Sequence, residues 1–483
     1  MTPPFDPPRP RPGGRHTRVR RVVVVLFVAL ASAGVAAYLL SDALRPPPPA
    51  NPFAALCHID PDIADPAIAR IAAGWCPEYA AMTLEVAPNF TLHPGHRAKL
   101  YALLREKTGQ TFDDAEYDDW YRWLWSQPAP DPKVLFRLRY EFYSYRAFPL
   151  GSLAGYFEGE PVATIRADEI RWGGVLRDGI RPVHQPVMVP AAAADYLADG
   201  DTVYGVRING DARAYPRRIL GHHELVTDTV GGEPIAGVYC TLCETMIAYH
   251  SRTADGVTHA FGTSGFLYRS NKLMYDKDTL SLWHTMTGKP VVGRLVPAGL
   301  RLAQSPVVTT TWAEWRRANP DTRVMSLDGL PEPNGDIWPD YREGEAYRDY
   351  NATDELMFAV PVLDRRLRNK DEVFVPRLPG EHPPVAVAAR YLAEHPVVLL
   401  NVGPTRVLVV TTPGGANRAF AVGDRVFSRA PDISTVTAAD GTVWTVAEDG
   451  LRSPAGETLP RVPGHRAFWF GWYSAHPDTI LVK

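Results

Sequence analysis

The chain has 483 residues, four cysteines and a formal net charge of −3. This length exceeds one ordinary hydrophobic core, so about two or three folded units are expected. A hydrophobic content of 45% and a charged content of 22% exclude a chain that is disordered throughout. The near balance of acidic and basic residues gives no footprint for nucleic-acid binding, and we expect no nucleic-acid partner.

An arginine-rich tail at residues 1–21 precedes an apolar segment at 22–40 that carries no charge. As a helix this segment is about 28 Å long, close to the roughly 30 Å of a bilayer core. It predicts a single transmembrane helix with a cytoplasmic N-terminus, since the positive flank stays inside. A cleaved signal peptide is the alternative, because small residues around 31–37 resemble cleavage sites. Both interpretations export the chain beyond the proline-rich linker at 41–52.

Residues 53–146 show helical periodicity. Aromatic side chains recur at helical spacing after residue 116, among them Tyr117, Trp120 and Tyr121, and such a stripe is more often core than a ligand platform. Cys57 and Cys76 enclose a short loop, and an oxidising compartment would favour a disulfide between them.

From about residue 165 the pattern changes to short strand-like runs separated by glycine, asparagine and aspartate turns such as Asn209-Gly210. No glycine-rich dinucleotide or phosphate loop follows a strand in the sequence. The expected class is therefore α+β, mainly β. A transmembrane helix and a helical region precede an antiparallel β-rich body.

An internal repeat predicts that this body is duplicated. Trp312-Ala-Glu-Trp315 is followed after four residues by Pro-Asp-Thr, and Trp469-Phe-Gly-Trp472 is followed in the same way. The predicted copies are residues 165–330 and a degenerate 370–483, joined by a linker at 331–369. Aligning 246–261 with 407–420 places residues 402–406, which contain no cysteine, opposite the first copy's cysteine pair.

Cys240 and Cys243 are spaced to hold one metal ion or to form a tight disulfide. With His223 they would form a soft metal site, for which copper is suited and zinc is possible. A thioredoxin-like dithiol is an alternative, although predicted strands flank the motif where that chemistry usually has a helix N-terminus. A plain structural disulfide is the third interpretation. Candidate site-lining residues are Glu224, His222, His250, Met274, Asp276 and His284.

Several motifs taken together resemble a known family. They are Asn209-Gly-Asp-Ala-Arg-Ala-Tyr-Pro216, His223-Glu224, Asp228-Thr-Val-Gly-Gly232, Cys240-x-x-Cys243 and Ser281-Leu-Trp283. This set resembles the bacterial domain of unknown function 3179 over about residues 165–360. That family usually reads Cys-Pro-Leu-Cys-Gly, where this chain has Thr241 and Glu244 in place of the proline and the glycine. The resemblance implies no particular activity.

We therefore expect a single-pass, membrane-anchored extracytoplasmic protein with a metal- or thiol-dependent site in the first copy. A non-enzymatic binding or scaffold module at the cell surface is one alternative, and a dithiol–disulfide oxidoreductase is another. Apart from the membrane, no motif indicates which protein or small molecule is the partner.

Overall fold

The computed structural model describes residues 51–57, 61–88, 92–145, 150–332, 339–380, 382–429 and 434–483. The predicted tail at 1–21, the predicted transmembrane helix at 22–40 and linker residues 41–50 lie outside the described residues. Within the described ranges, no helix combines the length and the apolar composition needed to cross a bilayer.

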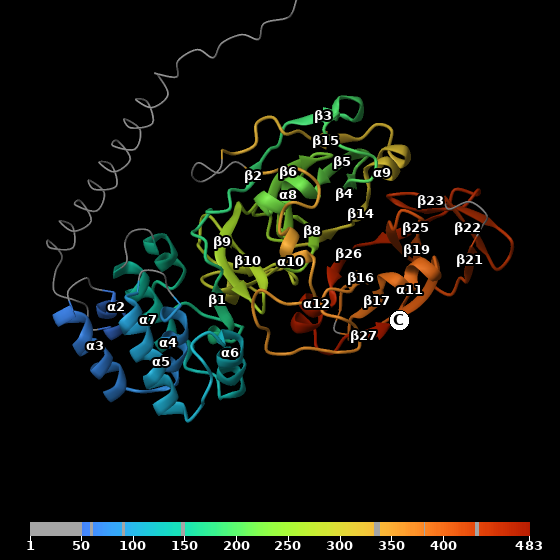
Figure 1. Cartoon of the computed structure of the whole chain (residues 1–483). Helices are drawn as coiled ribbons and strands as arrows, with labels where there is room; N and C mark the ends of the chain where they lie inside the picture. Colours follow the sequence, from blue (N-terminus) through green and yellow to red (C-terminus); the bar gives the residue numbers. More distant parts are fainter. Residues whose placement is uncertain are drawn as a thin grey trace, which may run out of the picture.

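The N-terminal helices form a bundle beside the β body (Figure 1). They are α2 (Pro52–Leu56), α3 (Pro61–Ala73), α4 (Pro77–Val86), α5 (Pro94–Thr108), α6 (Tyr117–Ser126) and α7 (Pro132–Tyr145). All but α6 begin with proline, whose fixed φ and missing N–H suit the first helical position. Trp120 and Tyr121 of α6 are buried in the core that joins this bundle to the β body, as the aromatic spacing predicts.

The predicted disulfide between Cys57 and Cys76 is not present in the structure. Cys57 follows α2 and is buried in the helical core, whereas Cys76 is half-buried directly before α4. The two side chains therefore lie at the ends of different helices. Burial raises the pKa of the Cys76 thiol.

The predicted mainly β body, preceded by helices, is confirmed. It contains two sheets with the same strand order and the same directions: β14-β4-β5-β15 and β26-β16-β17-β27. In each, the last strand pairs in parallel and the others are antiparallel. The strands are β4 (Thr202–Ile208), β5 (Asp211–Pro216), β14 (Val308–Thr311), β15 (Arg323–Met325), β16 (Glu372–Pro376), β17 (Val385–Ala388), β26 (Gly464–Phe468) and β27 (Ile480–Val482), with β3 (Met188–Pro190) added beside β15.

A three-stranded meander follows in each copy, after a short helix. These elements are α8 (Arg217–His223), β6 (Leu225–Val230), β7 (Glu233–Cys240) and β8 (Thr245–His250), then α11 (Ala389–Glu394), β18 (Val397–Val402), β19 (Thr405–Thr411) and β20 (Asn417–Ala421). A further strand flanks each meander, β13 (Gln304–Ser305) beside β8 and β25 (Thr458–Val462) beside β20. The strand β2 (Val183–His184) completes the first of these sheets.

Each copy carries a different insertion after its meander. In the first copy it is β9 (Phe261–Tyr268), β10 (Asn271–Asp276), β11 (Leu282–His284) and β12 (Lys289–Val292), which form a sheet with β1 (Ile170–Trp172). In the second copy it is β21 (Phe427–Arg429), β22 (Thr435–Ala438), β23 (Val443–Val446) and β24 (Gly450–Arg452). The short helical turns are η1 (Leu150–Tyr156), η2 (Ala167–Glu169), η3 (Ala191–Ala193), η4 (Val296–Ala298) and α10 (Arg348–Asn351).

The repeated Trp-x-x-Trp motifs form two equivalent helices, α9 (Trp312–Ala318) and α12 (Trp469–Ala475). The indole of Trp315 donates to the Thr322 hydroxyl at 2.8 Å, and that of Trp472 donates to Thr479 at 2.9 Å. Both indoles are fully buried. The sequence repeat thus preserves one buried hydrogen bond in each copy.

Each copy's meander turn packs on the other copy's tryptophan helix. The turn after β7 places the Cys243 sulfur against Gly471 of α12. The turn after β19 places Gly414 against Glu314 of α9, whose carboxylate accepts a hydrogen bond from Thr412. At both contacts a glycine faces a larger side chain. In the first contact the glycine belongs to the helix, and in the second it belongs to the turn.

This topology corrects the sequence alignment. Because β7 corresponds to β19, the counterpart of the cysteine turn is residues 412–416 and not 402–406. The sequence alignment matched β8 to β19, one strand out of step. Residues 412–416 also lack cysteine, so the two turns still differ in chemistry.

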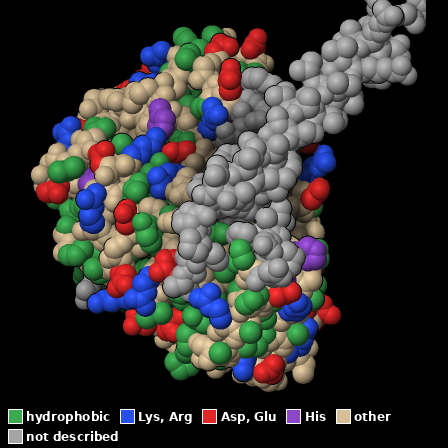
Figure 2. Space-filling model, turned by 90° about the vertical axis from the view of Figure 1, so that its left-hand side faces the viewer, with side chains coloured by type: hydrophobic (Ala, Val, Ile, Leu, Met, Phe, Trp, Pro, Cys, Tyr) green, Lys and Arg blue, Asp and Glu red, His purple; other side chains and the backbone are tan. Residues whose placement is uncertain are grey.

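The face of the molecule drawn in Figure 2 carries acidic and basic side chains interspersed with apolar ones. Among the described residues on that face, neither sign of charge gathers into a continuous patch. This agrees with the small net charge of the chain.

Candidate dithiol site

Cys240 ends β7, and Cys243 lies in the tight turn before β8. The backbone N–H of Cys243 donates to the carbonyl oxygen of Cys240 at 3.2 Å. The Cys243 carbonyl accepts from the Thr245 hydroxyl at 2.9 Å and from the backbone N–H of Phe468 at 2.8 Å. The turn is therefore fixed from its own copy and from the second copy. Both cysteines are thiols in this structure.

The Cys243 thiol is completely buried. Its sulfur lies 3.4 Å from the carbonyl oxygen of Ser270, and the Asn271 amide donates to the sulfur at 3.5 Å. Thr285 donates in turn to the Asn271 side chain and fixes it. Burial, with the neighbouring Cys240 sulfur as a second cause, raises the pKa of the Cys243 thiol well above its ordinary value.

The Cys240 thiol has the opposite electrostatic character. A hydrogen bond from the Cys243 thiol is the main cause that lowers the pKa of Cys240, and the backbone N–H of Lys272 adds to it. Burial and the Glu224 carboxylate oppose this lowering but do not cancel it. The pair is therefore asymmetric, with the thiolate favoured at Cys240.

A buried ion pair lies beside Cys240. The Lys272 ammonium is 2.7 Å from a Glu224 oxygen, and both side chains are more than nine-tenths buried. The Thr241 hydroxyl donates to the other Glu224 oxygen at 3.0 Å. Glu224 is the C-cap of α8 and adopts a left-handed backbone conformation. The chain turns at this residue, and the Glu224 carboxylate lies against the cysteine turn.

Cys240, but not Cys243, lines a cavity of about 70 Å³. The ion pair and Tyr347 line it too, and its other walls are largely apolar. A neighbouring cavity of about 560 Å³ between α6 and β1 shares Gly173, Met357 and Phe358 with it. Cys240 is thus the sulfur nearer to an approach from outside.

His223 does not join the two sulfurs in the described structure. Its Nδ1–H donates to the carbonyl oxygen of Arg181 at 2.8 Å, and its Nε2 lies 2.7 Å from the Tyr341 hydroxyl. Its ring stacks on Tyr341, and burial lowers the pKa of His223. Across the described residues, no group of three or more histidine, cysteine, aspartate or glutamate side chains is arranged to hold a metal ion. The predicted Cys240–Cys243–His223 metal site is therefore not formed here.

Two other predicted site-lining histidines are also engaged elsewhere. His222 Nε2 lies 3.0 Å from the carbonyl oxygen of Asp340. His250 Nε2 lies 2.8 Å from the Ser305 hydroxyl, at the junction of β8 and β13. Neither residue lines the cavity at Cys240.

Met274, Asp276 and His284 belong to the interior of the β9–β12 insertion. Met274 is fully buried core, and Asp276 accepts a hydrogen bond from His259 Nδ1 at 2.8 Å. His284 Nδ1 accepts from the backbone N–H of Met286 at 3.1 Å. Burial lowers the pKa of His284 to about 4, so the ring is neutral at pH 7. Of the six predicted lining residues, Glu224 alone reaches the cavity at Cys240.

Sequence reasoning missed Lys272, Thr241 and Tyr347 as residues around Cys240. Lys272 and Asn271 follow the turn between β9 and β10, and their register against β9 brings them onto the cysteine turn. The Ser270-Asn271 motif directly precedes Lys272 in the sequence, but its link to the cysteines depends on the insertion's position in space. The sequence signal that could have identified Lys272 was its position between that motif and a strand-like run.

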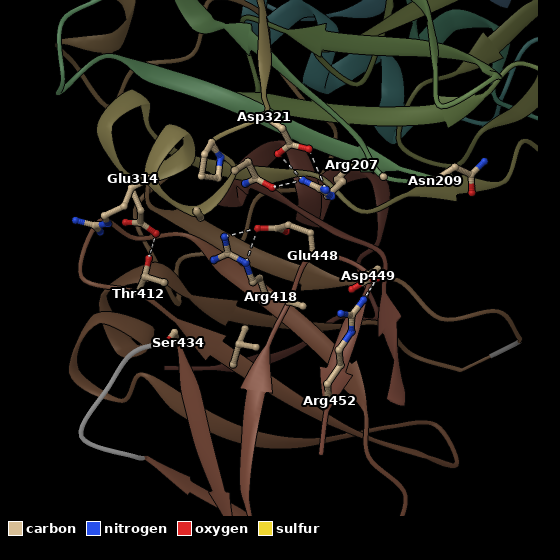
Figure 3. A pocket seen from close by; sticks show the side chains of 17 residues that line it. Arg207, Asn209, Glu314, Asp321, Thr412, Arg418, Ser434, Glu448, Asp449 and Arg452 are labelled. Atoms are coloured by element: carbon tan, nitrogen blue, oxygen red, sulfur yellow. Dashed lines mark hydrogen bonds and ion pairs between the residues drawn. The ribbon is translucent and has the colours of Figure 1, made fainter. Parts of the chain in front are cut away.

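A larger cavity of about 790 Å³ lies at the junction of the two copies (Figure 3). Its charged side chains are largely paired with one another: Arg207 with Asp321, Arg418 with Glu448, and Arg452 with Asp449. Internal pairing of this kind is typical of a structural interface. This cavity contains no cysteine.

The family described as a protein of unknown function, DUF3179, matches residues 177–479. The matched range contains both copies, the cysteine turn and the β9–β12 insertion. Comparisons with curated proteins and with solved structures gave no match.

Proposed function

This chain belongs to the DUF3179 family of proteins of unknown function, and from its site we propose that Cys240 and Cys243 form a redox-active dithiol. The observation that carries the proposal is the asymmetry of the pair. Cys240 has the lowered pKa and lines the cavity, whereas Cys243 is enclosed and has the raised pKa. Cys240 is therefore suited to be the attacking thiolate, and Cys243 is suited to be the resolving thiol.

The reaction would exchange a disulfide between the protein and a substrate. The Cys240 thiolate attacks one substrate sulfur, so a mixed disulfide forms, the substrate S–S bond breaks, and the released thiolate takes a proton. Deprotonated Cys243 then attacks the Cys240 sulfur, which releases the second substrate thiolate to be protonated. In sum, the protein dithiol loses two electrons and two protons, and the substrate disulfide gains them. The reverse direction oxidises a substrate dithiol.

The surroundings of the pair support a thiol function over metal binding. A metal ion would need further ligands, and no third histidine, cysteine or carboxylate completes such a set among the described residues. The groups that contact Cys243 are instead the Ser270 carbonyl and the Asn271 amide, which hydrogen-bond to a thiol. The second copy's counterpart turn has no cysteine, so the activity belongs to the first copy alone.

We further propose that this site works outside the cytoplasm, on a body anchored by the apolar segment at 22–40. The charge-free sequence of that segment and its arginine-rich flank support this placement. Reporter fusions after residue 52 give the test. An alkaline phosphatase that is active only when exported should be active in the fusion, and inactivity would contradict the proposal.

Equilibration of the purified full-length chain in glutathione redox buffers tests the thiol proposal. Trapping and mass spectrometry should show a reversible Cys240–Cys243 disulfide with one two-electron midpoint. Cys243→Ser should accumulate a mixed disulfide at Cys240, because the resolving step is lost. Cys76→Ser serves as the matched control and should leave the midpoint unchanged.

Two results would contradict the thiol proposal. Both thiols could stay unmodified across the whole range of redox buffers, or the pair could retain a stoichiometric metal ion after purification. If Cys240→Ser and Cys243→Ser alter stability alone, the non-enzymatic binding or scaffold module expected as an alternative is favoured.

A further inference from the structure

A second cavity, separate from the dithiol, carries an excess of positive charge. It has a volume of about 470 Å³ and lies where β8 and β13 of the first copy meet β25 of the second. Arg301, Arg377 and Arg461 line it, and no carboxylate does. It shares no lining residue with the cavity at Cys240.

Arg461 is buried without a full set of partners. Its side chain is 5% exposed, and its Nε has no hydrogen-bond partner among the described residues. One Nη donates to the Ala419 carbonyl oxygen at 3.3 Å, and the other is 4.0 Å from a Glu448 oxygen. Glu448 is already bound by Arg418 at 2.9 Å. Burial is the main cause that lowers the pKa of Arg461 to about 9, which indicates an under-neutralised cation.

Arg377 is held by neutral groups only. Its Nη atoms lie 3.4 Å from the Met286 carbonyl oxygen and 3.5 Å from His476 Nε2, and its guanidinium lies over the Trp472 ring. Burial lowers the pKa of Arg377, and the charge of Arg301 lowers it further. These contacts fix the side chain in place and leave its charge unbalanced.

Arg301 is exposed and follows η4 on the way to β13. It makes no hydrogen bond or ion pair with any described residue. The cavity therefore combines two guanidiniums held by contacts, one buried (Arg461) and one half-buried (Arg377), with a third that is exposed. Burying cations without counter-charges costs free energy. An anion bound among these arginines would therefore stabilise the folded protein.

We infer that Arg301, Arg377 and Arg461 form a binding site for the phosphate group of a small organic molecule. Guanidinium groups bind phosphate oxygens in a planar, bidentate manner, and three of them more than offset the charge of a dianion. A volume of about 470 Å³ exceeds that of a phosphate ion, and Leu378, Pro379 and Pro463 provide apolar wall for an organic part. The inference does not depend on the dithiol.

The cavity in Figure 3 provides a contrast within the same molecule. There the arginines face Asp321, Glu448 and Asp449, so a phosphate would meet carboxylates as well as guanidiniums. Arg461 lines the cavity of Arg301 and Arg377. One of its Nη atoms also lies 4.0 Å from an oxygen of Glu448, which lines the cavity in Figure 3. The cavity of Arg301, Arg377 and Arg461 thus lacks the carboxylates that line the cavity in Figure 3.

Calorimetric titration of the full-length chain with inorganic phosphate and with glycerol 3-phosphate, at constant ionic strength, tests the inference. Saturable binding of both is expected, with the organic phosphate tighter. Arg461→Met should weaken binding by about tenfold, or about 1.4 kcal/mol. Arg301→Gln should weaken it several-fold without affecting the fold, because this side chain is exposed.

Arg390→Gln is the matched control, since it removes an exposed arginine of α11 that does not line the cavity. It should leave both affinities unchanged. Absence of saturable binding by the wild-type chain would overturn the inference, as would equal weakening by Arg390→Gln and Arg301→Gln. Equal affinities for the two phosphates would overturn the assignment of an organic ligand and support a site for phosphate ion itself.

Discussion

The Cys243 sulfur packs directly on Gly471, where an added Cβ would lie 2.7 Å from it. Gly471 is in α12 of the second copy, so the enclosed thiol of the first copy is covered by its counterpart. The burial that raises the pKa of Cys243 is therefore partly provided from across the repeat.

Gly471→Ala is expected to destabilise the protein. Alanine in a helix is favoured over glycine by up to about 1 kcal/mol, but overpacking against a fixed sulfur costs about 1–3 kcal/mol. The clash should prevail, and denaturant unfolding monitored by tryptophan fluorescence measures it. Gly200→Ala, with open space around its Cβ position, is the control. Adding Cys243→Ala should recover part of the loss, and an unchanged loss in the double variant would refute the contact.

Cys243→Ala should raise the pKa of Cys240, because the hydrogen bond from Cys243 is the main cause that lowers it. The rate of Cys240 alkylation, followed by mass spectrometry against pH, should then rise at a higher pH than in the wild-type chain. Cys76→Ala should not move this profile. A profile that stays in place in Cys243→Ala would show that another group lowers the pKa.

Lys272→Met should cost about 3–5 kcal/mol of unfolding free energy, because it leaves the Glu224 carboxylate buried and unpaired. Lys99→Met, which breaks the exposed pair with Asp65, should cost about 0–1 kcal/mol. Chemical denaturation compares the two. Combining Lys272→Met with Glu224→Gln should restore much of the loss, and a double variant as unstable as Lys272→Met would contradict the explanation.

Stability should fall as pH is lowered from 6.5 toward 4, with His284 contributing. The pKa of His284 is about 4 in the folded chain because of burial, against an ordinary histidine value of 6.5. Between these values the unfolded chain binds a proton that the folded chain does not, so unfolding becomes easier as pH falls. The full effect of this one residue is about 3 kcal/mol.

Variants isolate this contribution from the other groups that titrate in the same range. His284→Asn keeps an acceptor near the Met286 N–H and removes the titration, so its stability should depend less steeply on pH. His395→Asn, at an exposed position, should keep the wild-type slope. Equal slopes in both variants would assign the pH dependence to other residues.

Local patterns were sufficient for much of the fold. Asn209 and Gly210 both adopt positive φ in the turn between β4 and β5, as an Asn-Gly pair in a two-residue hairpin predicts. The repeat of Trp315 and Trp472 likewise corresponds to two matching buried hydrogen bonds. Both signals are local, so they could be read without knowing the tertiary structure.

The site depended on longer-range contacts and was predicted only in part. Cys240, Cys243 and Glu224 were identified, but His223 was grouped with the two cysteines because its imidazole suits a soft metal site. It ends α8 with its ring against Tyr341, which lies 118 positions away. Nothing in the local sequence of a histidine indicates such a partner.

The exchange of contacts between the two meander turns and the two tryptophan helices has a consequence for how the halves can change. A larger side chain at Cys243 requires space at Gly471, and a larger one at Gly414 requires a shorter side chain at Glu314. Substitutions on one side are thus accepted only with matching substitutions on the other. Separate expression of either half would leave its turn open to solvent, so the pair of halves is the smallest complete unit.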